Sequence, residues 1–83
     1  MKKIFESNLN GWDESANKIN VYALESDREW NEFYDMTHKE RCELFNVFDE
    51  HGCDIMPGGI YRTYDFNICG NFIVMTETLA LNV

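Results

Sequence analysis

The last third of the chain shows the clearest alternation of hydrophobic and polar positions. Residues 60–69 and 72–81 are two runs rich in β-branched and aromatic residues, and Gly70-Asn71 separates them. Glycine at the first central position suits a two-residue type II′ turn, which joins neighbouring antiparallel strands. The pattern therefore predicts a β-hairpin.

The register of this hairpin produces one face that is almost entirely apolar. A two-residue loop pairs Cys69 with Phe72, Phe66 with Met75, Tyr64 with Glu77, Arg62 with Leu79 and Ile60 with Leu81. The apolar face then consists of Ile60, Arg62, Tyr64, Phe66 and Ile68 beside Ile73, Met75, Glu77, Leu79 and Leu81. Its two charges, Arg62 and Glu77, lie on a diagonal where opposite charges can meet. A slip of one residue would destroy the agreement between the strands, so we expect this face to be buried.

Two further segments upstream predict strands. Residues 18–24 alternate between a face with Ile19, Val21 and Ala23 and a face with Asn20, Tyr22 and Leu24. This period is typical of a strand with one buried face. Residues 3–9 contain a short apolar pair and predict an edge strand. Residues 8–17 collect Asn, Gly, Asp and Ser around Trp12, which is typical of a loop.

Two capping boxes predict two short helices in the middle of the chain. Ser26 and Thr37 are each followed three residues later by a glutamate, Glu29 and Glu40. In such a box the hydroxyl and the carboxylate each accept a hydrogen bond from a backbone N–H that the helix start leaves unpaired. The middle of the chain therefore starts two helices in series.

These starts predict helices over residues 27–36 and 38–51. The apolar spacing loses its phase between the two boxes, and a new stripe begins with Leu44, Phe45 and Phe48. Gly52 then suits the left-handed C′ position that ends a helix. We therefore expect two short helices rather than one long helix.

The elements together predict one α+β domain over residues 1–83. It is a small two-layer fold with an antiparallel sheet, built from the C-terminal hairpin, the strand near residues 18–24 and an N-terminal edge strand. The two short acidic helices cover one face of the sheet. At 9.8 kDa, a chain buries about 60 to 65% of its unfolded surface, which provides one core and little room for a deep cleft.

Composition adds a strong negative charge to this fold. Fifteen acidic residues against seven basic ones give a formal charge of −8, while 14% aromatic and 45% hydrophobic residues are typical of an ordered globule. The charge disfavours nucleic acid and anionic membranes as direct partners and favours basic protein surfaces. Solubility alone is the alternative explanation of the charge.

The cysteine count and the N-terminal residues indicate a compartment. Three cysteines do not form a closed set of disulfides, which favours a reducing environment. The N-terminal residues lack an apolar run of signal-peptide length, and no stretch approaches the roughly 20 apolar residues of a membrane span. We therefore expect a cytoplasmic protein.

One set of side chains resembles a zinc-ligand set in type and spacing. His38 and Cys42 lie one helical turn apart, and His51 and Cys53 follow. On a single helix, however, the two histidines would be about 20 Å apart at a rise of about 1.5 Å per residue. We therefore predict no metal site and no other cofactor.

The sequence contains no constellation that indicates catalysis. Gly58-Gly59 lacks the following Lys-Ser/Thr of a phosphate-binding loop. A nucleophilic thiolate needs an electropositive site, whereas Cys42, Cys53 and Cys69 lie in an acidic chain. We expect that the protein is not an enzyme.

The predicted helices carry most of the charge. Residues 25–54 contain ten acids and three bases, a local charge of −7. Carboxylates along two helices can imitate the phosphates of nucleic acid and occupy a basic groove, although a merely solvated face is the alternative. The predicted partner-binding residues are Glu29, Glu32, Asp35, Glu40 and Glu43, with Trp12 as an apolar anchor. The alternative for Trp12 is that its indole attaches the loop to the core.

These observations predict a small, non-enzymatic protein-binding module. We expect an inhibitor that engages the basic surface of a nucleic-acid-binding protein. The composition is similar in general character to phage-encoded anti-defence inhibitors, anti-CRISPR proteins included, and many unrelated acidic domains share it. The alternative is a structural domain that forms a homodimer through the other hairpin face, with Tyr61, Phe72 and Val74.

Overall fold

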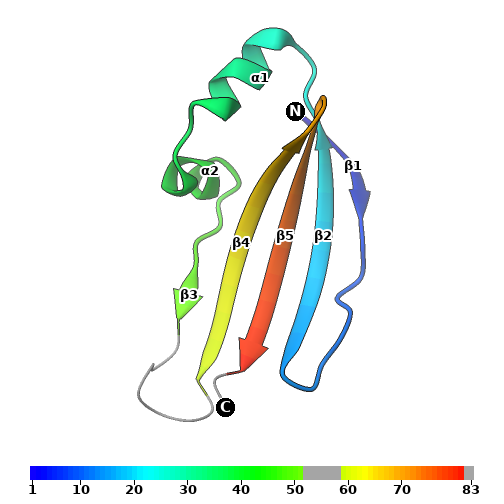
Figure 1. Ribbon diagram of the computed structural model, residues 1–83, viewed down its shortest axis with the longest axis vertical. Coiled ribbons are helices and arrows are strands. Elements are labelled where there is room, and N and C mark those ends of the chain that lie inside the picture. Colours follow the sequence, from blue (N-terminus) through cyan, green and yellow to red (C-terminus); the bar gives the residue numbers. More distant parts are fainter. Residues whose placement is uncertain (52–58, 82–83) are drawn as a thin grey trace.

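The computed structural model describes residues 1–51 and 59–81 and confirms the small two-layer α+β fold (Figure 1). In chain order the elements are β1 (Lys2–Glu6), β2 (Ser15–Ala23), α1 (Asp27–Tyr34), α2 (His38–Leu44), β3 (Glu50–His51), β4 (Ile60–Cys69) and β5 (Phe72–Leu81). The strands form one antiparallel sheet in the order β1-β2-β5-β4-β3, in which β3 is a two-residue edge strand.

The C-terminal hairpin has the predicted register along its whole length. β4 and β5 pair from Cys69 with Phe72 at the turn to Ile60 with Leu81 at the open end. Gly70 has a φ of 60°, whereas Asn71 is not among the positive-φ residues, so only the first central position is left-handed. This pattern is the type II′ turn that the sequence predicted.

β2 begins three residues earlier than predicted, and its pairing with β5 decides which of its faces is buried. Asn20 lies opposite Met75 and Tyr22 opposite Ile73, so the side of β2 with Asn20 and Tyr22 joins the apolar face of the hairpin. Ala16, on the same side, is completely buried. The predicted edge strand is also present as β1, which pairs with β2 across a bulge.

Both predicted helix starts are confirmed. Thr37 and Glu40 form a complete capping box in which each side chain accepts a hydrogen bond from the other residue's backbone N–H. Ser26 accepts from the N–H of Glu29, but the Glu29 carboxylate accepts from the N–H of Glu25 instead of that of Ser26. α1 ends at Tyr34, close to the predicted end.

The predicted end of the second helix is wrong, because α2 ends at Leu44 rather than at residue 51. Asn46 has a φ of 55°, and the N–H groups of Asn46 and Val47 donate to the carbonyls of Glu43 and Cys42. These bonds form a Schellman motif with asparagine in the left-handed C′ position. Glycine is the most common residue at this position, and asparagine also adopts it. Gly52, the predicted terminator, lies outside the described residues.

The early end of α2 changes the course of the following chain. Residues 45–49 turn back along the sheet, and β3 pairs with β4 where the prediction had helical turns (Figure 1). Phe48, which the predicted stripe placed towards the core, is 66% exposed. None of the helices within residues 1–51 and 59–81 has the length and apolar character needed to cross a membrane.

Aromatic rings from both layers form the centre of the core. Phe45 follows the last residue of α2, and its ring lies 4.7 Å from Tyr22 and 5.4 Å from Phe66, centroid to centroid. Phe33 of α1 is 1% exposed and meets Phe45 and Phe66 edge-on. Because such rings bury large apolar areas, this cluster attaches the helices to the sheet.

Candidate functional site

The predicted partner-binding residues do not form one surface. Glu29 and Glu32 lie on α1, Asp35 follows α1, and Glu40 and Glu43 lie on α2. Trp12 is 58% exposed, but it belongs to the connection between β1 and β2, which Figure 1 shows at the opposite end of the sheet from α1. The structure therefore places the five acids on or directly beside the two helices and separates Trp12 from them.

Two of the five acids, Glu29 and Glu40, make internal hydrogen bonds that lower their pKa. A Glu29 oxygen lies 2.8 Å from the N-terminal ammonium of Met1, whose hydrogen bond lowers the pKa of the Glu29 carboxyl. Glu40 belongs to the capping box of α2, and the hydrogen bond from the N–H of Thr37 lowers its pKa. Sequence reasoning chose both residues for their charge, although the Glu29 carboxylate also binds the N-terminus and the Glu40 carboxylate also caps α2.

The other three acids, Glu32, Asp35 and Glu43, are exposed. Glu32 lies 2.9 Å from Arg28 one helical turn away, and such solvated pairs are worth little. Arg41 is directed inwards, since its guanidinium donates to the carbonyls of Phe33 and Phe66. Arg41, one of the three bases counted in this acidic stretch, therefore binds backbone carbonyls of the protein instead of these exposed acids.

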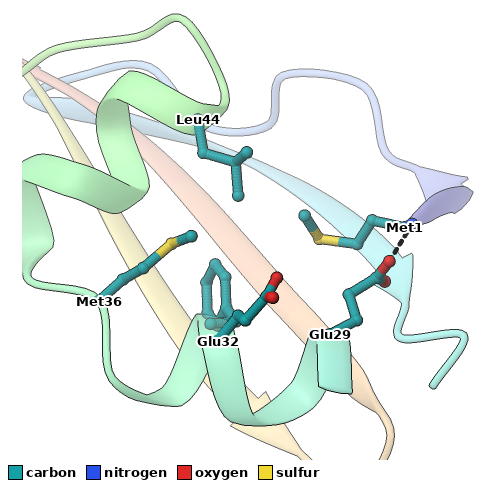
Figure 2. Close-up of a pocket in the computed structure, with 6 residues that line it drawn as sticks. Met1, Glu29, Glu32, Met36 and Leu44 are labelled. Atoms are coloured by element: carbon teal, nitrogen blue, oxygen red, sulfur yellow. Dashed lines mark hydrogen bonds and ion pairs between the residues drawn. The ribbon is translucent and has the colours of Figure 1, made fainter. Parts of the chain in front are cut away.

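A pocket of about 280 Å³ opens beside these acids, between the two helices and the N-terminus (Figure 2). It is lined by Met1, Glu29, Glu32, Phe33, Met36 and Leu44. Methionine side chains adapt to the shape of a ligand, and Figure 2 shows two of them facing one another across the hollow with both carboxylates at its side.

Sequence reasoning missed the apolar part of this pocket. The predicted helical stripe assigned Leu44 to the core, yet it is 47% exposed, because α2 ends at this residue and the chain turns away. Met36 lies in the link between the helices, and Met1 precedes β1 at the start of the sequence. Only the packing of three separate segments brings these side chains together.

A second cluster involves part of the zinc-ligand set considered above. The prediction of no zinc site assumed one helix through residue 51, which would hold the two histidines far apart. That premise is wrong, since α2 ends at Leu44. His38 and Cys42 do lie together, and the returning chain adds Asp49, which the sequence did not indicate. Burial, with Asp49 and Glu43 nearby, raises the pKa of the Cys42 thiol, so this thiol is not an activated nucleophile. Cys53 lies outside the described residues.

Comparison of the chain with protein-family models, with curated proteins and with solved structures finds no match.

Proposed function

We propose that this chain is a protein-binding module that engages a basic surface of another protein through the helices α1 and α2. The pocket between these helices supports the proposal most directly, because it combines apolar walls with carboxylates. Met1, Met36 and Leu44 supply apolar surface, and Glu32 supplies negative charge beside it. The Glu29 carboxylate also lines the pocket, but its charge is balanced by the Met1 ammonium 2.8 Å away. A lysine or arginine has the complementary form, with an apolar stem and a cationic head.

The surroundings of the pocket favour the same class of partner. The exposed acids Glu32, Asp35 and Glu43 lie on or beside the same two helices, and the chain carries a charge of −8. Such a field steers a basic surface towards the pocket and weakens as salt is added. A nucleic-acid-binding protein presents basic residues in a groove, so occupation of that groove would make the chain an inhibitor of the anti-defence kind.

The experiment tests location and charge separately. A triple variant, Glu32→Lys, Asp35→Lys and Glu43→Lys, is compared with a control triple, Asp13→Lys, Glu14→Lys and Asp65→Lys. All six positions are exposed, and both variants change the net charge by the same amount, but the control sites lie away from the helices. The wild-type chain and both triple variants are tagged and used to capture basic nucleic-acid-binding proteins from lysate at low and high salt. Titration of each purified chain with a captured partner then measures the affinity.

We expect the wild-type chain and the control triple to retain a basic nucleic-acid-binding partner at low salt, and we expect the helix triple to lose it. Equal loss in both triples would mean that only net charge matters. Equal retention in both would rule out the helical surface. Far-ultraviolet circular dichroism checks that both variants fold.

A second candidate function, homodimerisation, has one specific observation in its favour. The face of the sheet opposite the helices carries exposed apolar side chains, with Phe72 at 44%, Ile19 at 39% and Phe5 at 54%. Val21 and Val74 are cross-strand partners between them. Sedimentation at micromolar concentration tests this candidate, since a dimer that Phe72→Glu dissociates supports it and a strict monomer rules it out.

A further inference from the structure

Three chemically different side chains meet beside α2. His38 lies in the first turn of this helix, Cys42 lies one turn later, and Asp49 returns to them after the Asn46 turn. The Nε2 atom of His38 lies 2.8 Å from Oδ2 of Asp49 and 3.6 Å from Sγ of Cys42. One ligand atom from each residue lies within 4.8 Å of the other two.

Hydrogen bonding to the ring nitrogen of His38 satisfies only one of its two neighbours at a time. Both neighbours approach the same ring nitrogen, which offers either one N–H or one in-plane lone pair. If Nε2 carries a proton, the proton can point at the carboxylate and the thiol cannot donate to it. If Nε2 is unprotonated, it can accept from the thiol but then faces the negative carboxylate at 2.8 Å.

The same geometry is unsuited to cysteine catalysis. In a Cys-His-Asp relay the acid orients the ring through one nitrogen, while the other nitrogen takes the proton from sulfur. Here the acid and the sulfur share Nε2, and Cys42 is only 5% exposed. The three groups converge on one point, as the ligands of a metal ion do.

Local structure positions two of the three ligands, His38 and Asp49. The capping box of Thr37 sets the start of α2 immediately before His38. Asp49 accepts a hydrogen bond from the N–H of Tyr64 through Oδ1, at 3.0 Å, so Oδ2 is the oxygen directed at His38. Such an outer hydrogen bond is the usual means of orienting a carboxylate ligand.

We propose that His38, Cys42 and Asp49 bind a divalent transition-metal ion and that Zn²⁺ fits them best. Thiolate, imidazole and carboxylate are the zinc ligands of proteins, whereas calcium and magnesium favour oxygen alone. Ligand atoms around a tetrahedral zinc ion are about 3.2 to 3.6 Å apart. The two distances from His38 Nε2, 2.8 and 3.6 Å, are close to that range, and the ligand atoms of Cys42 and Asp49 lie within 4.8 Å of one another, so side-chain movements suffice to reach this geometry.

The proposed site has three protein ligands and an open fourth position. The side chain of His38 is 50% exposed, so the cluster reaches the surface and water can complete the coordination. The ion would join α2 to the segment that leads into β3, and so to the edge of the sheet. This site is separate from the pocket between the helices and does not depend on the proposed function.

Cobalt binding tests the site with a direct spectroscopic signature. Co²⁺ is titrated into the full chain after chelator treatment, in a phosphine reductant that keeps the thiols reduced. We expect one equivalent to bind, with near-ultraviolet thiolate-to-cobalt charge transfer and the strong visible bands of tetrahedral cobalt. Zn²⁺ should displace the cobalt and remove both signals.

Variants assign the ligands. Cys42→Ser should abolish the charge-transfer band, and Cys69→Ser, at the exposed tip of the hairpin, is the matched control that should leave it unchanged. Because Cys42 is buried and its variant can fail to fold, two more accessible positions provide the second test. His38→Gln and Asp49→Asn should weaken cobalt binding at least about 100-fold, since even outer-shell partners are worth about 10- to 100-fold.

Three results would overturn the proposal. The first is the absence of a charge-transfer band in the wild-type chain. The second is a band that persists in a folded Cys42→Ser variant, which would assign the thiolate to another cysteine. The third is wild-type cobalt affinity in both His38→Gln and Asp49→Asn.

Discussion

The two faces of the sheet differ in what covers them, although the same strands form both. One face packs against the helices, and its central residues Tyr64, Phe66, Ile73 and Met75 are each at most 8% exposed. On the other face Phe72 and Ile19 remain substantially exposed. Apolar residues are thus present on both sides, and burial depends on the helical layer rather than on strand composition.

The covered face itself divides into two parts along the strands. Beneath the helices it is apolar, whereas towards the open end of the hairpin it carries charges from four strands, Lys18, Glu77, Arg62 and Glu50. Arg62 lies 3.3 Å from Glu77, which confirms the predicted diagonal pair, and 3.4 Å from Glu50. The side chains of Lys18, Arg62 and Glu50 are 31 to 47% exposed, which limits their cost of desolvation, whereas Glu77, at 22%, is the most buried of the four.

The largest expected difference between the two faces comes from removing an aromatic ring. Phe33→Ala takes away a side chain that is 1% exposed and contacts Phe45 and Phe66, so we expect a loss of about 3 to 5 kcal/mol. Phe72→Ala removes the same atoms from a half-exposed position and should cost less than about 1 kcal/mol. Urea unfolding measures both, and equal losses would mean that the second face is covered in solution.

A smaller effect is expected at the charged end of the covered face. Glu77→Gln should cost about 1 kcal/mol, because Glu77 is mostly buried and also accepts from the Tyr64 hydroxyl, while Arg62 keeps Glu50 as a partner. Glu32→Gln, which breaks an exposed pair with Arg28, should cost less than about 0.5 kcal/mol.

Thermal unfolding of these variants sharpens the contrast. The double variant Glu77→Gln with Glu50→Gln should lose more than the sum of the single losses, because Arg62 is then left without either acid. Equal melting temperatures for Glu77→Gln and Glu32→Gln would show that the Arg62 pair is as fully solvated as the surface pair.

The smallest effect concerns the helical layer and depends on pH. The Thr37 hydrogen bond lowers the folded-state pKa of Glu40 below its ordinary value of 4.5. The stabilisation is therefore present above pH 4.5 and is lost as the pH falls through the lower folded-state pKa. The stability difference between the wild-type chain and Glu40→Gln should shrink between pH 6 and pH 3. A difference that stays constant over this range would contradict the role of the carboxylate.

Local interactions explain why so much of the fold was predictable from the sequence. The Gly70-Asn71 turn and the alternation of β4 and β5 specify the same register, and each of the two helix starts depends on a cap within four consecutive residues. Each of these signals is complete within a short stretch of chain, because a turn or a cap is satisfied by its own neighbours. The sequence therefore determined the hairpin, its buried face and the two helix starts.

The end of α2 and the candidate sites depended on tertiary structure. Asn46 competes with Gly52 as a helix terminator, and the packing of Phe45 against Tyr22 and Phe66 accompanies the earlier end. That turn brings Asp49 to His38 and leaves Leu44 beside the pocket. Contacts between residues distant in sequence form only when the layers pack together, so local patterns predicted the elements but not the pocket or the cluster that those elements create.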